Sequence, residues 1–220
     1  MIDLKREGDV FVLRLDAGEN RFNSEMISAW NHALDEVEAA EGPKALVTTG
    51  TGKFYSNGLD LDYMGEVDTD AYLKSVMAIM GRVLVFPCAT AVAVNGHAFG
   101  AGAQLLLCHD FRIMRTERGY FCMPEIDMKA PLHPGMTAII MARVPALTAH
   151  ELIVTGTRYG AELALEKGIV DAIAPEDEVV AAAIARVAPL AAKAHPAMNL
   201  LKSGMYPHVL DALKQKLGGE

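Results

Sequence analysis

Cysteine is scarce in this sequence, and the few cysteines form no redox or metal motif. The 220 residues include only Cys88, Cys108 and Cys122, and no two of them make a CxxC pair. Disulfide frameworks and zinc sites need cysteines in such pairs or clusters. We therefore expect three reduced core residues in a cytoplasmic protein, with no metal site.

Basic residues are also in the minority. The sequence has 20 Lys and Arg against 28 Asp and Glu, so its formal net charge is -8. A protein that binds nucleic acid usually presents a basic face. The charge balance therefore indicates no nucleic-acid partner, while a local basic pocket for an anionic ligand stays possible.

No apolar segment is long enough and clean enough to predict a membrane span. Residues 83–108 lack formal charge, but Pro87, several glycines and polar residues such as Asn95 interrupt them. A strand, a turn and a buried helix fit this pattern better than a spanning helix. The first 16 residues alternate charged and apolar side chains, so we expect no secretory signal either.

What the sequence does contain is a recurring pattern of a short apolar strand followed by a loop. The strands are expected at 45–49, 90–94 and 111–114. Three such units suggest stacked copies of one supersecondary element. In α/β proteins, ligands tend to bind where the loops gather at one end of parallel strands.

The N-terminal and C-terminal parts of the sequence predict different kinds of secondary structure. Residues 9–16 alternate apolar and polar side chains and predict a half-buried strand, and Asn23 is placed to cap the helix that follows. Beyond Pro145 the pattern becomes mostly helical and rich in alanine. We therefore expect a core with the site in residues 1–150, and a helical packing or oligomerisation region in residues 151–220.

A glycine turn stands out in the segment GHAFGAGAQLLLCHD, residues 96–110. Its spacing, GxxxGxG, is neither the dinucleotide fingerprint nor a P-loop. A strand, glycines and then a helix leave free N–H groups at the helix N-terminus, where a small anion or a developing oxyanion fits. In the earlier loop KFYSNGLDL, Gly58 permits close approach and Leu59 offers a second N–H. Two ordinary glycine turns are the alternative.

Several segments together resemble the crotonase (enoyl-CoA hydratase/isomerase) superfamily. They are KFYSNGLDL, NGHAFGAGAQLLLCHDFRIM, CMPEID and ELIVTGTRYGAELALEKGIVDAI, in the expected order. The resemblance implies an α/β fold: a spiral of ββα repeats with a helical C-terminal region, assembled as trimers or paired trimers. It also implies that the N–H groups of Leu59 and Ala101 hold the carbonyl of an acyl-CoA thioester. Coenzyme A would be part of the substrate, and no prosthetic group is expected.

One catalytic position decides which reaction the resemblance implies. Hydratases of the family use two glutamates, at positions that match Gln104 and Glu125 here. An amide cannot shuttle a proton, whereas a partly buried carboxyl group can. One carboxylate suffices for a 1,3 proton shift, so we expect a single-glutamate Δ3,Δ2-enoyl-CoA isomerase. The alternatives are an enoyl-CoA hydratase, another crotonase-type reaction, or a catalytically silent acyl-CoA-binding subunit.

The resemblance also suggests residues that support the site. Arg21 and Phe22 match a segment that contacts coenzyme A, and Lys53 is a weaker candidate; solvated surface positions are the alternative. The acyl pocket candidates are Tyr63, Met64, Phe99, Gln104, Met123, Leu132 and His133. Lys129 stands where the family commonly has glycine. It either turns outward or pairs with Glu125 or Asp127, which would make the carboxylate less basic.

Overall fold

The computed structural model describes residues 2–218. The chain begins with an antiparallel pair, β1 (Ile2–Glu7) and β2 (Val10–Leu15). Strand β2 is buried along nearly its whole length, not half-buried as its alternation predicts. It lies inside the sheet, and its alternate side chains enter two apolar clusters, with Leu13 in one and Val12 in the other.

The main sheet has six strands in the order β1-β2-β3-β5-β7-β9, and every pair after the first is parallel. Its remaining strands are β3 (Ala45–Gly50), β5 (Ala89–Val94), β7 (Phe111–Arg115) and β9 (Ala172–Ala174). β9 comes from the region expected to be helical. The division of the chain at residue 150 stays a prediction.

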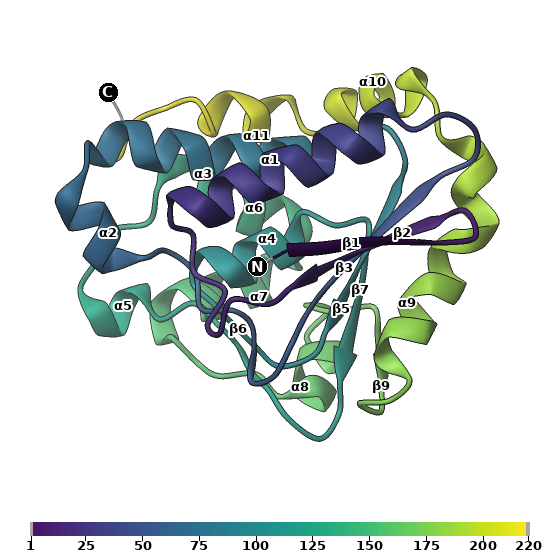
Figure 1. Ribbon diagram of the computed structural model, residues 1–220. Coiled ribbons are helices and arrows are strands. Elements are labelled where there is room, and N and C mark those ends of the chain that lie inside the picture. The colour runs from purple at the N-terminus through teal and green to yellow at the C-terminus, as the bar shows by residue number, and fades with distance from the viewer. Residues whose placement is uncertain (1, 219–220) are drawn as a thin grey trace.

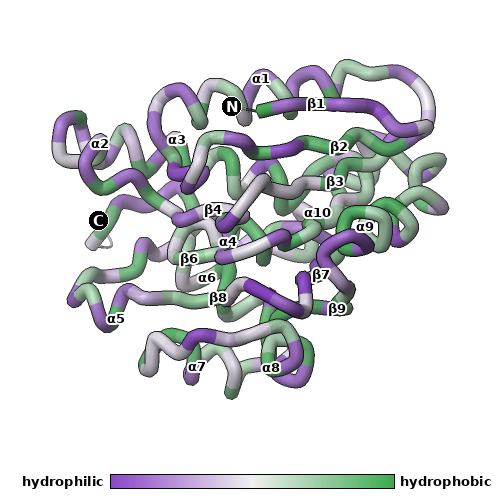
Figure 2. The backbone as a smooth tube through the Cα atoms, turned by 60° about the horizontal axis from the view of Figure 1, so that its bottom comes forward, coloured by the Kyte–Doolittle hydropathy of each residue, from purple (hydrophilic) through white to green (hydrophobic). Residues whose placement is uncertain are grey.

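A second, smaller sheet forms within the segments that the sequence suggests are loops. Its short parallel strands are β4 (Phe54–Ser56), β6 (His97–Phe99) and β8 (Phe121–Cys122). Each follows one strand of the main sheet and precedes a helix, which gives the expected ββα repeat three times. In Figure 2, β4, β6 and β8 lie next to one another at the centre of the molecule.

Helices pack around the two sheets. Asn23 caps α1 as predicted, since its Oδ1 accepts a hydrogen bond from the Met26 N–H at 2.9 Å. The helices are α1 (Ser24–Ala39), α2 (Leu61–Glu66), α3 (Thr69–Leu84), α4 (Ala101–Leu107), α5 (Glu125–Met128), α6 (Pro134–Arg143), α7 (Ala146–Thr155), α8 (Ala161–Glu166), α9 (Val179–Val187), α10 (Pro196–Met205) and α11 (Pro207–Ala212), with a 3-10 helix at Ala188–Lys193.

Two apolar clusters lie on opposite faces of the main sheet. The larger one holds side chains from α1, α3, α4 and α6, including the fully buried Trp30. The smaller one packs α9 against the other face, so that α1 and α3 lie on one side of the sheet and α9 on the other (Figure 1). Cys88, Cys108 and Cys122 are buried and unbridged, which confirms them as core residues.

Within residues 2–218, none of the helices is both long enough and apolar enough to pass through a membrane.

Candidate active site

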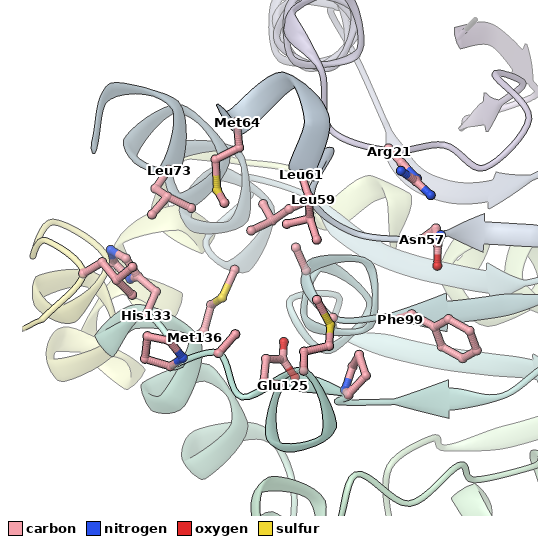
Figure 3. A pocket seen from close by; sticks show the side chains of 17 residues that line it. Arg21, Asn57, Leu59, Leu61, Met64, Leu73, Phe99, Glu125, His133 and Met136 are labelled. Atoms are coloured by element: carbon pink, nitrogen blue, oxygen red, sulfur yellow. The ribbon is translucent and has the colours of Figure 1, made fainter. Parts of the chain in front are cut away.

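A cavity of about 330 Å³ opens where the repeat loops meet (Figure 3). Its lining is mostly apolar and comes from several helices and from the loops that follow the small sheet. Among the residues that line it are Leu59, Leu61, Met64, Leu73, Ala101, Met128 and Met136. Glu125 is the one carboxyl-bearing residue of the lining among the residues that the structure describes.

The first loop is shaped around Gly58. Its φ is +84°, a left-handed conformation that glycine adopts at little cost. A Cβ at this position would lie 2.7 Å from the Phe99 carbonyl oxygen and 3.0 Å from the Ala101 nitrogen. Only glycine therefore allows the two glycine loops to touch. This contact brings the backbone of Leu59, the next residue, beside the N-terminus of α4.

Backbone and side-chain hydrogen bonds hold the first loop in place. The N–H of Phe22 donates to the Gly58 carbonyl at 2.9 Å. The Ser56 hydroxyl accepts from the Gly58 N–H at 3.2 Å and donates to the Asn20 carbonyl at 2.7 Å. The Tyr72 hydroxyl donates to the Phe22 carbonyl at 2.6 Å. The loop is thus fixed before any ligand binds.

The second loop turns at Gly100, whose φ is +50°, and α4 begins at the next residue, Ala101. Gly102 packs directly on Ser56, where a Cβ would overlap the backbone. The first N–H groups of a helix have no acceptor within the helix, and the helix dipole favours negative charge beside them. Leu59 and Ala101 both line the cavity, so their backbones are suited to hold an oxyanion between them.

Glu125 lies beside this turn, on the short helix α5. A Cβ placed on Gly100 would come within 3.5 Å of the Glu125 Oε1 atom. The other carboxyl oxygen, Oε2, is buried and has no hydrogen-bond partner among residues 2–218. Figure 3 shows the carboxyl group pointing into the cavity. Burial removes water from the charged form and so raises the pKa of Glu125 above the ordinary value of 4.5.

Gln104 is fully buried but is not among the residues that line the cavity. Its Nε2 donates to the Met123 sulfur at 3.7 Å, and its Oε1 has no hydrogen-bond partner in the part of the chain that the structure describes. Met123 directly precedes the Pro124-Glu125 pair. Gln104 therefore supports the segment that carries the glutamate, from a position behind the cavity wall.

Of the other pocket candidates, Met64, Phe99 and His133 line the cavity. Tyr63 packs edge-on against Tyr72, with ring centroids 5.6 Å apart. Met123 and Leu132 belong to or pack against the core. Leu73, Met136 and Leu217 also line the cavity, but they lie far apart in the chain and carry no local motif that would predict it.

The three candidates for contact with coenzyme A lie in different environments. Arg21 lines the cavity on the side of Asn57 and Phe99, and its guanidinium pairs with Glu19 at 2.6 Å (Figure 3). The Phe22 side chain is 1% exposed, so it belongs to the core and only its backbone holds the first loop. The Lys53 ammonium group lies 5.2 Å from the centroid of the Phe54 ring, outside the cavity lining.

Of the two arrangements expected for Lys129, the structure shows the one in which its side chain turns outward. Its φ is +55°, and its N–H donates to the Ile126 carbonyl at the end of α5. The side chain is exposed and makes no ion pair with Glu125 or Asp127 within the described part of the chain. Lys129 occupies the left-handed position that commonly ends a helix and that glycine usually fills. It therefore leaves the basicity of Glu125 untouched.

A chain of buried hydrogen bonds connects α4 to strands β3 and β4. The Thr48 hydroxyl lies 3.1 Å from the Tyr55 hydroxyl and 2.9 Å from His109 Nε2. His109 Nδ1 lies 3.0 Å from the Leu105 carbonyl, which can only accept, so Nδ1 carries the proton and Nε2 accepts. Burial lowers the pKa of His109 to about 4, and the ring stays neutral at physiological pH.

The comparisons with known proteins agree with these features of the site. The family model described as "Enoyl-CoA hydratase/isomerase" matches residues 5–220. Enoyl-CoA delta isomerase 3 of Arabidopsis thaliana is 33% identical over 204 residues, covering 88% of this chain and 86% of the relative. The peroxisomal enoyl-CoA delta isomerase 2 of the same plant is 31% identical over 228 residues, covering 97% and 95%.

A bacterial relative and a solved structure extend the comparison. A putative enoyl-CoA hydratase of Thermus thermophilus is 32% identical over 207 residues, covering 89% of this chain and 80% of the relative. The apo structure of an enoyl-CoA isomerase from Mycobacterium tuberculosis matches with a TM-score of 0.90 at 25% identity. This match covers 97% of this chain and 94% of the other.

Proposed function

Because this chain belongs to the enoyl-CoA hydratase/isomerase family, we propose that it is a Δ3,Δ2-enoyl-CoA isomerase acting on acyl-CoA thioesters. The observation that carries the proposal is that Glu125 is the one carboxyl group of the cavity lining within residues 2–218. Glu125 borders the turn at Gly100, and the other family glutamate position holds Gln104, outside the lining. Relatives named as delta isomerases support the same choice.

In the proposed reaction, Glu125 removes a proton from C2 of a 3-enoyl thioester. The electron pair of the broken C–H bond forms a C1–C2 double bond, the carbonyl π electrons move onto the thioester oxygen, and the C3–C4 double bond remains, which gives a dienolate. The N–H groups of Leu59 and Ala101 stabilise that oxygen. Removing one such donor costs about 3–4 kcal/mol in enzymes where this has been measured. The carbonyl then re-forms, the C1–C2 electron pair becomes the C2–C3 double bond, and the C3–C4 pair takes the proton from the acid form of Glu125 at C4. No net proton is gained or lost.

The cavity suits the other requirements of this chemistry. Its apolar lining excludes water from the carboxylate and strengthens the hydrogen bonds to the enolate. The raised pKa of Glu125 makes the carboxylate a stronger base than an exposed glutamate. Arg21 borders one end of the cavity and can pair with a phosphate of coenzyme A, with Glu19 as the competing partner.

A test of the proposal separates isomerisation from hydration. Purified protein is incubated with 3-enoyl-CoA and, separately, with 2-enoyl-CoA, and products are identified by chromatography. Interconversion of the two double-bond isomers is the expected result, and 3-hydroxyacyl-CoA should not accumulate. Accumulation of 3-hydroxyacyl-CoA would instead support a hydratase, the function named for some relatives.

The catalytic role of Glu125 is tested by Glu125→Gln, which keeps the size of the side chain and removes the base. We expect isomerisation to fall by about a hundredfold or more, because general acid–base catalysis contributes on that scale. The control is Glu162→Gln, an exposed glutamate of α8 outside the cavity, which should leave activity unchanged. A Glu125→Gln protein with full activity rules out the mechanism.

A silent acyl-CoA-binding subunit is distinguished by proton exchange. In deuterated water, the proposed base exchanges the C2 proton of a bound thioester, whereas a silent subunit binds the thioester without exchange.

We further propose a homo-oligomer, because Leu147, Leu200 and Leu201 are at least 71% exposed and would be covered at a subunit interface. The family resemblance implies a trimer or hexamer. A cytoplasmic location stays a prediction, and two of the plant relatives are named as peroxisomal.

A further inference from the structure

At one end of the cavity, three side chains also line a second cavity. In Figure 3, Arg21 and Phe99 lie on one side of Glu125, and Leu73 and His133 lie on the other. Leu73, His133 and Leu217 line the first cavity and also a neighbouring one of about 200 Å³. These three side chains, the end wall, therefore separate the two spaces.

The two spaces differ in chemistry. The first is lined mainly by leucine, methionine and proline side chains. The rest of the second is lined largely by charged and polar groups, namely Asp70, Lys74, Lys214, Gln215 and Lys216. An alkyl chain gains free energy from contact with the first lining and gains little from the second. The end wall thus marks the boundary of the apolar space.

Leu217 is held in the wall by contacts of the residues just before it. His133 Nδ1 accepts the Gly135 N–H at 3.0 Å, so the ring proton is on Nε2, which donates to the Gln215 carbonyl at 2.8 Å. The Lys216 ammonium group pairs with Asp70 of α3 at 3.0 Å. Leu73 and His133 are at most 4% exposed, whereas Leu217 is 38% exposed. Leu217 is thus the outermost part of the wall.

Building on the proposed function, we propose that Leu217 ends the acyl pocket and determines how long an acyl chain the protein accepts. His133 acts as a positioning residue that holds the segment carrying Leu217 against α6. An acyl chain longer than the apolar space has to displace Leu217 and place its last methylene groups among charged side chains. The protein should therefore gain affinity with each added methylene only until the chain reaches the wall.

The proposal is tested by binding, without relying on catalysis. Dissociation constants of the saturated thioesters butanoyl-, octanoyl- and hexadecanoyl-CoA are measured by calorimetry for the wild type and Leu217→Ala. We expect the variant to bind hexadecanoyl-CoA at least about tenfold more tightly than the wild type does, with butanoyl-CoA unchanged. Leu165→Ala, the same truncation at an exposed leucine of α8, should change neither. An unchanged ratio of hexadecanoyl to butanoyl affinity in Leu217→Ala overturns the proposal.

Two further variants test the wall from other directions. Leu217→Trp should shorten the pocket and weaken octanoyl-CoA binding, with butanoyl-CoA binding retained. His133→Asn can still cap α6 through its side-chain oxygen, but its shorter side chain loses the bond to Gln215. We expect it to reproduce the chain-length shift of Leu217→Ala while the melting temperature stays close to that of the wild type. Wild-type chain-length dependence in His133→Asn would refute the role of His133.

The experiments distinguish failure of the end-wall proposal from failure of the proposed isomerase function. A wild type that binds the thioester series with the expected limit but does not isomerise 3-enoyl-CoA supports the end wall and refutes the isomerase. A wild type that isomerises 3-enoyl-CoA and gains affinity steadily up to hexadecanoyl-CoA refutes the end wall alone. Absence of binding to the whole series refutes both.

Discussion

The ionised carboxylate of Glu125, which the proposed reaction needs, is unfavourable for the stability of the folded protein because it is buried. One of its carboxyl oxygens is buried without a partner, and burial raises the pKa of the group. A carboxyl group whose pKa is higher in the folded than in the unfolded state contributes stability below the unfolded value. That stability is lost as the pH rises through the folded value. At neutral pH the ionised base therefore destabilises the fold.

Replacing this base should make the protein more stable and less active. At about pH 8, we expect Glu125→Gln to melt at a higher temperature than the wild type, and each kcal/mol of relief adds about 2–4 °C for a chain of this size. At about pH 4 the wild-type carboxyl group is itself neutral, so the difference should vanish. Thermal melts at the two pH values measure this. A variant that melts lower than the wild type at both would show that burial is not the dominant effect.

At the scale of elements, the site depends on the contact between two loops from different repeats. Gly58 belongs to the loop after β4, and its missing side chain leaves room for the start of α4 at Ala101. The short strands β4 and β6 align these loops side by side. A pair of donors from separate repeats is therefore a property of the small sheet and not of either loop alone.

Gly58→Ala should separate the loops and disable the oxyanion hole. Its new methyl group would lie 2.7 Å from the Phe99 carbonyl oxygen, so we expect kcat to fall about a hundredfold or more. Gly52→Ala is the matched control, because Gly52 has a similar φ of +69° but nothing within 4 Å of the added Cβ. The control should lose about 1–2 kcal/mol of stability and keep its activity. Equal activities of the two variants would contradict the proposed role of the contact.

At the scale of the whole molecule, a partly buried ion pair joins the C-terminal helices to the main sheet. The Lys202 ammonium group on α10 donates to the Asp110 carboxylate at 2.7 Å and to the Phe86 and Cys88 carbonyls. Asp110 in turn accepts from the Thr90 N–H at 2.8 Å, at the start of β5. The three bonds of Lys202 connect residues that are 92 to 116 positions apart in the sequence.

Removing the lysine should destabilise the whole fold. Lys202→Met leaves Asp110 as a partly buried, unpaired charge, and we expect a loss of about 3 kcal/mol in the free energy of unfolding, measured by urea denaturation. Lys193→Met, at an exposed lysine, should stay within about 0.5 kcal/mol of the wild type. Adding Asp110→Asn to Lys202→Met should recover part of the loss. A loss below about 1 kcal/mol would mean that the pair is not a major link.

The sequence predicts the parts of this protein that depend on neighbouring residues. Asn23 as a helix cap, the three repeated strands and the glycine turns all follow from local spacing, because capping and left-handed turns are decided within a few residues. The burial of β2 was predicted incorrectly, because an alternating pattern does not reveal helices that cover both faces. The short strands of the small sheet were missed for a similar reason, since their pairing partners are distant in the chain.

The sequence alone determined which chemical groups are available to the site: one carboxyl group at position 125, an amide at position 104, and glycines where two backbones have to meet. Only the tertiary structure decided which of these groups share a cavity. It placed Arg21 at the cavity and Phe22 in the core, and it put Gln104 behind the wall. It also brought Leu217 to the cavity lining, beside residues far away in the sequence. Residue identity fixes what a side chain can do, whereas its neighbours depend on the packing of elements far apart in the sequence.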